Sequence, residues 1–94
     1  MLQTEYYRAL QQVQDAERQM NLYAEQSQLA NKLLILKIKS FSASQTDLAD
    51  VLRARQQLLD YELKQLDALI QYNTAKAQFR RLLAQSTITQ QPEN

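Results

Sequence analysis

The chain has 94 residues and a formal net charge of +1, with no glycine, cysteine or histidine and a single proline, Pro92. Without cysteine or histidine it lacks disulfides, thiolate metal sites and the usual general base at neutral pH. We therefore predict that it is not an enzyme and that it binds no metal or other cofactor. A charge near zero provides no field to steer the chain to nucleic acid, so no nucleic-acid partner is expected. Sixteen leucines, sixteen glutamines and eleven alanines favour long helices instead.

A heptad stripe runs through the first half of the chain and predicts a helix over residues 2–40. Apolar or small side chains recur at alternating steps of three and four, the spacing of a helix that packs against another helix. A second apolar row lies beside the stripe, so this helix is expected to contact neighbours on more than one side. The stripe is Tyr6, Ala9, Val13, Ala16, Met20, Tyr23, Ser27, Ala30 and Leu34, and the second row is Leu22, Leu29, Leu33 and Leu36.

A serine-rich interruption at residues 41–46 predicts a turn. Hydroxyl side chains compete with the backbone for hydrogen bonds and therefore favour caps and turns over helix interiors. Ser44 and Asp47 have the spacing of a capping box, and Thr46 is a competing N-cap. We expect the second helix to begin at about residue 47.

The double stripe returns in the second half and predicts a helix over residues 47–85. Residues 86–94 are polar and contain Pro92, so they are expected to form a disordered tail. The stripe is Val51, Ala54, Leu58, Tyr61, Gln65, Ala68, Tyr72, Ala75, Phe79 and Leu82, and the second row is Leu48, Leu52, Leu59, Leu63, Leu66 and Ile70.

The charges favour two helices over one. In each predicted helix the acidic residues lie in the first part, and the last part carries only lysine and arginine. Both placements match the helix dipole, at about 0.3–1 kcal/mol per charge. The predicted fold is therefore all-α: a long antiparallel two-helix coiled-coil hairpin, about 60 Å long. Its uncovered second rows favour self-association, and for the isolated chain we expect a dimeric four-helix bundle.

A second arrangement stays open because the turn contains no glycine. If residues 40–46 became helical, two copies could exchange helices and form a rod of about 120 Å in place of about 60 Å.

The residues around the turn resemble the C-terminal repeat of the outer membrane efflux protein family, the TolC-like exit ducts. They are most similar to its heavy-metal and cation efflux branch. In that family an aromatic residue, a tip glycine and a helix start containing Asp-Val-Leu mark a periplasmic hairpin. The resemblance covers about residues 20–85 and rests on Phe41, Ser44, Asp47, Leu48, Asp50, Val51, Leu52, Ala54, Leu58, Leu59, Leu63, Ala68, Tyr72, Ala75, Leu82 and Leu83.

The resemblance implies a duct-forming hairpin from a homotrimeric channel that crosses the cell outer membrane and reaches into the periplasm. Such a channel is the passive conduit of a tripartite efflux system, and the chain would be a fragment of an exported parent. The hairpin tip would dock on a periplasmic adaptor protein, and Asp50 would take the place of a carboxylate that constricts the lumen. The implied tip residues are Phe41, Ala43, Ser44, Gln45, Thr46 and Asp47.

Two positions depart from the family pattern. Ser44 stands in place of the tip glycine and takes a positive φ at a higher energetic cost, so the turn geometry could differ. Arg53 stands where some members repeat an aspartate, so a local pair of Asp50 and Arg53 could replace a second acidic ring at the lumen gate.

Simpler interpretations stay open for the same residues. Asp47 and Asp50 stabilise the start of any helix through its dipole. Lys37 and Lys39 are expected to form a solvated helix end, and Phe41 a hydrophobic plug beneath the turn. For the chain as a whole, the alternative is a generic coiled-coil scaffold or dimerisation module with no transport role.

Overall fold

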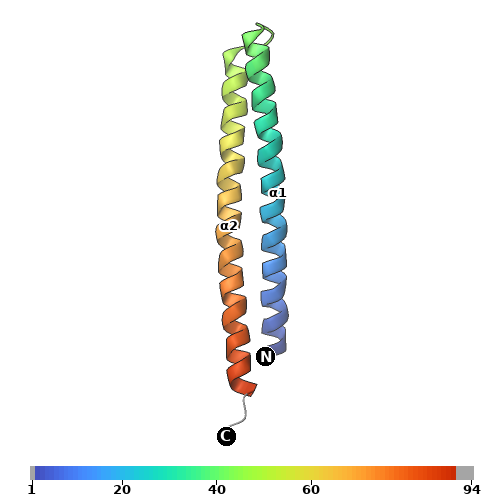
Figure 1. The fold of residues 1–94 in the computed structure, drawn as a ribbon, viewed down its shortest axis with the longest axis vertical. Helices are drawn as coiled ribbons and strands as arrows, with labels where there is room; N and C mark the ends of the chain where they lie inside the picture. Colours follow the sequence, from blue (N-terminus) through green and yellow to red (C-terminus); the bar gives the residue numbers. More distant parts are fainter. Residues whose placement is uncertain (1, 91–94) are drawn as a thin grey trace.

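The computed structural model describes residues 2–90, with their side chains from residue 3 to residue 85. It contains two α-helices, α1 (Leu2–Ser42) and α2 (Leu48–Gln90), and residues 2–90 include no strand. The helices run antiparallel along each other and are joined at one end by residues 43–47 (Figure 1). The predicted all-α helical hairpin is therefore confirmed.

A narrow seam of small side chains holds the two helices together. Among the side chains described, from residue 3 to residue 85, the buried apolar residues are all alanines, and the larger stripe residues between them are only half-buried. Because alanine is small, the helices approach closely and cover little apolar surface. The predicted stripe is thus the seam on both helices, except that Tyr6 at its end is 36% exposed. The buried alanines are Ala16, Ala30, Ala54, Ala68 and Ala75.

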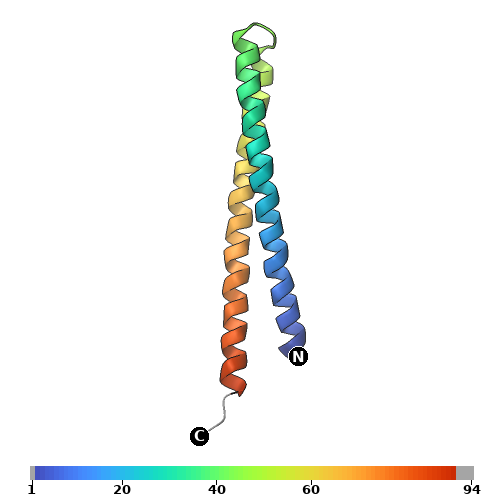
Figure 2. The same cartoon turned by 45° about the vertical axis from the view of Figure 1, so that its right-hand side comes forward.

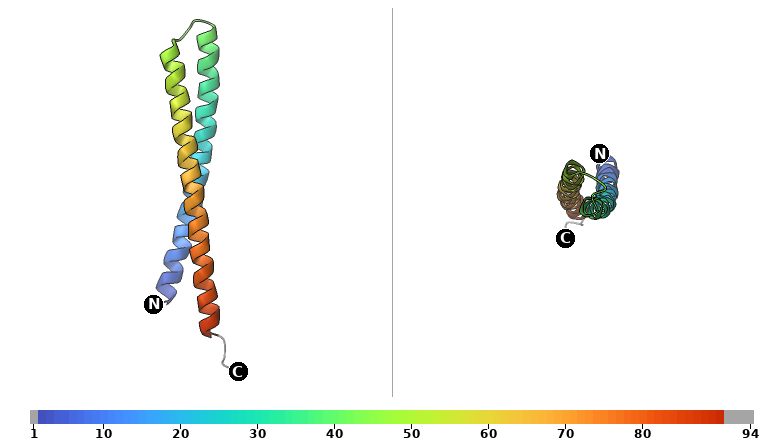
Figure 3. Two further views of the ribbon diagram at one scale, coloured as in Figure 1. Left: turned by 90° about the vertical axis from the view of Figure 1, so that its left-hand side faces the viewer. Right: turned by 90° about the horizontal axis from the view of Figure 1, so that it is seen from above.

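Aromatic side chains close the seam at the end away from the turn. The ring centroids of Tyr6 and Phe79 are 5.3 Å apart, and Tyr7 packs edge-on against Tyr6 at 6.0 Å. The helices cross along the rod, and α1 leans away from α2 toward its N-terminus (Figure 2 and Figure 3). The aromatic contact therefore bridges the part of the hairpin where the helices separate.

The observed helix bounds correct the predicted ones. Phe41 and Ser42 belong to α1, so the predicted turn began two residues too early. The second helix begins at Leu48 and continues to Gln90, five residues beyond the predicted end. No residue in the range 86–90 is a helix breaker, and the first strong stop signal is Pro92. The predicted disordered tail is therefore wrong for residues 86–90, and residues 91–94 lie outside the described residues.

The hairpin buries too little surface for a compact domain. Its accessible surface is 7504 Å² for a mass of 11.0 kDa. An unfolded chain of that mass exposes about 16,000 Å², so folding covers only about half, whereas even a 60-residue domain covers about 60%. Both second rows stay exposed: Leu22, Leu29, Leu33 and Leu36, which we call the α1 row, and Leu48, Leu52, Leu59, Leu63, Leu66 and Ile70, which we call the α2 row.

Candidate functional site

The turn begins with a left-handed residue that ends α1. Ser44 has a φ of 60°, and it is the position at which the resemblance places a glycine. The Gln45 amide donates to the Ser40 carbonyl at 2.8 Å, and the Ser44 amide donates to the Phe41 carbonyl at 2.9 Å. This pair of bonds is the Schellman motif, in which the residue after the helix usually is glycine. Serine therefore accepts the positive φ at this position.

Asp47 caps the start of α2. Its Oδ1 accepts a hydrogen bond from the Asp50 amide at 3.2 Å, which satisfies one of the free N–H groups at the helix start. The predicted N-caps, Ser44 and Thr46, are wrong. Ser44 instead terminates α1, and the Thr46 hydroxyl is used by another partner, the Asp50 carboxylate.

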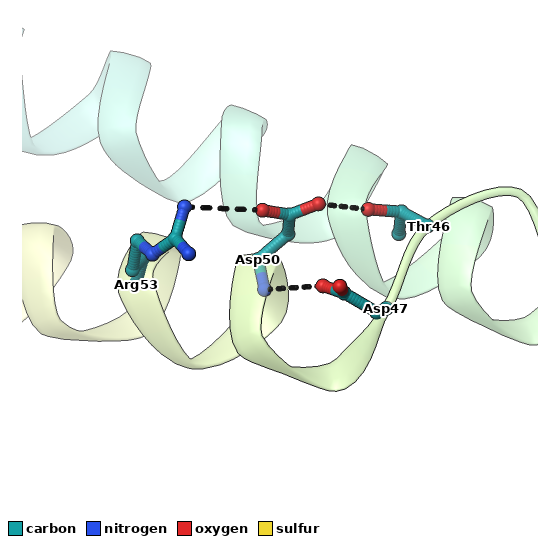
Figure 4. Close-up of polar contacts among 4 residues, drawn as sticks. All are labelled: Thr46, Asp47, Asp50 and Arg53. Carbon is teal, nitrogen blue, oxygen red and sulfur yellow. Dashed lines mark hydrogen bonds and ion pairs between the residues drawn. The ribbon is translucent and has the colours of Figure 1, made fainter.

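The Asp50 carboxylate is held from both sides (Figure 4). The Thr46 hydroxyl donates to its Oδ2 at 2.5 Å, and the Arg53 guanidinium lies 3.4 Å from its Oδ1. The pair of Asp50 and Arg53 anticipated from their spacing is thus present. The hydrogen bond from Thr46, followed by the positive charges of Lys37 and Arg53, lowers the pKa of Asp50 below its ordinary value. Asp50 is therefore firmly ionised at neutral pH.

Lys37 also belongs to the group of side chains that act on the Asp50 carboxylate. This role was not predicted, because Lys37 was expected to lie on a solvated helix end. It follows Leu34 by three residues, so it continues the seam and is half-buried, while Lys39 is exposed. Its position in the stripe was the available signal. A lysine at the end of the seam, opposite the first turn of α2, brings a positive charge to Asp50 from the other helix.

The predicted docking residues gather on the exposed end of the hairpin. Within residues 41–47 only Thr46 is half-buried, and the others are exposed. Phe41 is 44% exposed, so the plug predicted beneath the turn is not formed. The turn therefore presents an aromatic ring and several polar groups to any partner.

The α1 row flanks one face of the hairpin. The groove on this face is lined mainly by polar side chains of both helices, including Asp15, Gln19 and Gln78. Members of the α1 row follow Asp15 or Gln19 by multiples of seven residues, so they lie on the same side of the helix.

The α2 row flanks the opposite face. There, Leu66 lines a gap together with Met20 and Glu62, and Glu62 also lines a groove with Asn31. Leu52 and Leu59 precede Leu66 by multiples of seven residues and therefore share its side. Each helix thus has an uncovered apolar row. The α1 row and the part of the α2 row formed by Leu52, Leu59 and Leu66 lie on opposite sides of the seam, whereas Ile70 of the α2 row lines the first groove.

The two rows occupy the same height along the rod. Met20 lines one gap with Leu66, and Ser27 lines another with Leu58, which fixes how the helices are aligned. The α1 row, from Leu22 to Leu36, therefore lies level with most of the α2 row. The α1 row and Leu48 to Leu63 of the α2 row belong to the half of the hairpin nearer the turn, and Leu66 and Ile70 lie just beyond its middle.

Other kinds of site are not apparent within residues 2–90. No group of three or more metal-ligating side chains is present there, and neither helix is apolar enough over a sufficient length to cross a bilayer. The candidate functional surfaces are therefore the turn and the two rows. No protein-family model, curated protein or solved structure matches the chain.

Proposed function

We propose that this chain is a duct-forming helical hairpin of an outer membrane efflux channel, part of a passive export conduit in a tripartite efflux system. The observation that carries the proposal is the pair of exposed apolar rows, one on each helix, with the α1 row on the face opposite Leu52, Leu59 and Leu66. The resemblance around the turn suggests the family of the channel. The two exposed rows support an arrangement in which several hairpins pack side by side as a wall.

A helix in such a wall has a neighbour on each side and needs two apolar stripes. Both α1 and α2 have a second stripe, and each is about half-exposed in the single hairpin. A hairpin with neighbours on both sides would cover the α1 row with one neighbour and the α2 row with the other. Two hairpins packed face to face in a four-helix bundle would leave one row of each hairpin exposed to water. The predicted bundle would therefore bury less of the exposed apolar surface than a wall of hairpins.

The turn supports a docking role at the end of the wall. It is short, and its backbone is fixed by the Schellman motif of α1 and the Asp47 cap of α2. Ser44 has a left-handed backbone conformation of the kind that glycine adopts readily, which is compatible with a glycine at this position in the family pattern. A rigid, exposed tip of this kind suits binding to a periplasmic adaptor protein with little loss of conformational entropy.

Asp50 is proposed as the charged residue of the duct entrance. It lies in the first turn of α2, next to the tip, and its lowered pKa keeps it ionised. Arg53 partly neutralises it, so a ring of these pairs would be less negative than a double ring of aspartates.

The test expresses the whole reading frame in which residues 1–94 are encoded, including any coding sequence on either side of them. The proposal expects flanking transmembrane β-strands, a second hairpin, and a channel in planar bilayers. Asp50→Ala should change the single-channel conductance or the block by divalent cations, and Asp60→Ala, an exposed acid farther along α2, should not. A frame that yields no channel would support the scaffold alternative. Unchanged conductance and cation block in Asp50→Ala would reject the gate at this residue.

A further inference from the structure

We propose that the chain also forms an open, exchanged dimer, in which residues 43–47 become helical and α1 of each copy pairs with α2 of the other. The partner is a second copy of this chain. The contact it makes is the seam already seen within the hairpin, extended through the former turn.

The backbone of the turn favours this exchange. Ser44 is held in the left-handed region, which is unfavourable for any residue with a Cβ atom. Straightening the turn returns Ser44 to the helical region. Residues 43–47 contain neither glycine nor proline, so each can form helix. The hydrogen bond from the Ala43 amide to the Lys39 carbonyl is already helical, and the two bonds donated by the Ser44 and Gln45 amides would be replaced by helical ones.

The seam of a straightened chain would continue through the turn. Beyond Leu34 and Lys37, steps of three and four lead through Phe41, Ser44 and Leu48 to Val51. The only irregularity is that the next seam residue, Ala54, again follows by three, which a coiled coil accommodates by a local change of winding. The exchanged dimer can therefore have one uninterrupted seam.

The seam of an exchanged dimer would include two apolar residues that flank the former turn and are exposed in the hairpin, Phe41 and Leu48. Tyr6 contacts Phe79, and Ser27 lines the same gap as Leu58. Continuing this alignment across the turn places Phe41 of one copy level with Ser44 of the second copy, about one helical turn from Leu48 of that copy. In the hairpin the side chains of Phe41 and Leu48 are 44% and 53% exposed, and the exchanged dimer would cover them at two equivalent places.

The first test measures dimerisation and length together. In sedimentation and small-angle scattering across a concentration series, the wild-type chain should form a dimer with a maximum dimension of about 130 Å, against 78 Å for the hairpin. A dimer with the 78 Å length of the hairpin would overturn the proposal, because hairpins that associate side by side through their outer rows keep that length. Absence of any dimer up to the solubility limit would overturn it too. Neither scattering result affects the test of channel formation in planar bilayers. A failure of the exchanged dimer can therefore be distinguished from a failure of the proposed function.

The second test changes the cost of the turn. Ser44→Gly stabilises the left-handed turn and therefore the closed hairpin. It should favour the hairpin about fivefold per turn, so the dissociation constant of the exchanged dimer, which has two former turns, should rise about 30-fold. The matched control is Ser42→Gly, because residue 42 is helical in both forms and should leave the constant nearly unchanged. An equal effect of both variants would contradict the proposal.

A third measurement reports directly which helices are paired. The chain has no cysteine, and Gln12 and Gln78, which are both exposed, line the same groove across the seam. With cysteines at these two positions, a short bis-maleimide should give closed monomers from dilute samples and covalent dimers from concentrated ones. Only closed monomers at every concentration would show that exchange does not occur.

Discussion

Replacing Ala68 with leucine tests whether close approach of alanines sets the distance between the helices. Ala68 is the most buried of the seam alanines, at 3% exposure. Leucine adds three carbon atoms at a point where the facing helix leaves almost no room. We expect Ala68→Leu to destabilise the hairpin, although leucine is the more apolar residue and an excellent helix former.

Two opposing effects determine the size of the change. If the helices could separate freely, burying three more carbons would stabilise the fold by about 2.4 kcal/mol, at roughly 0.8 kcal/mol each. Separation would, however, remove the contacts of the neighbouring alanines Ala54 and Ala75, one to two heptads away. Overpacking a close-packed site costs about 1–3 kcal/mol. For a chain of this size we expect the melting temperature to fall by roughly 5–20 °C.

The assay is thermal unfolding followed by far-ultraviolet circular dichroism at one fixed protein concentration. Ala77→Leu is the matched control, because Ala77 is exposed on the same helix, and its effect should stay within about 0.5 kcal/mol. The seam is the same in the hairpin and in an exchanged dimer, so the expectation holds for both. If Ala68→Leu melts at or above the wild-type temperature while Ala77→Leu is neutral, the reasoning from alanine packing is refuted.

Two predictions concern the start of α2. Because the pKa of Asp50 is lowered in the folded chain, its carboxylate stabilises the fold above its unfolded pKa, and this contribution is lost as the pH falls through the folded value. Urea unfolding should therefore show wild type more stable than Asp50→Asn at about pH 7, with the gap closing at about pH 2; an equal gap at both pH values would contradict this assignment. Asp47→Ala should cost about 0.5–2 kcal/mol through loss of the cap, whereas Asp47→Asn, which keeps the acceptor oxygen, should cost less in the same urea assay.

The periodic part of the structure could be predicted from the sequence because a heptad stripe has one main physical solution. Residues from Ala9 to Leu34 and from Val51 to Leu82 repeat at three and four, and these are the residues that the helices bury against each other. The exposed α1 and α2 rows followed from the same logic, since a two-helix rod can cover only one stripe per helix.

The turn was harder to predict because its residues have several competing partners. Ser44, Thr46 and Asp47 can each cap a helix by local hydrogen bonding, and the sequence does not rank these bonds. The choice was made by the backbone: once Ser44 ends α1 in a left-handed conformation, Asp47 is the residue that is positioned to cap α2. The effect of Lys37 on Asp50 could not be predicted from the sequence either, because the two residues come close only when the two helices fold together.

The shape of the seam also has a consequence for the order in which the rod folds. Contacts near the turn join residues close in sequence, while the contact between Tyr6 and Phe79 closes nearly the whole chain into a loop. Closing a longer loop loses more chain entropy, so we expect the helices to pair first beside the turn and then progressively outward, each step adding only a short new segment. The fixed turn at residues 43–47 would then be the place where folding starts, and the aromatic pair at the open end the last contact to form and the first to break.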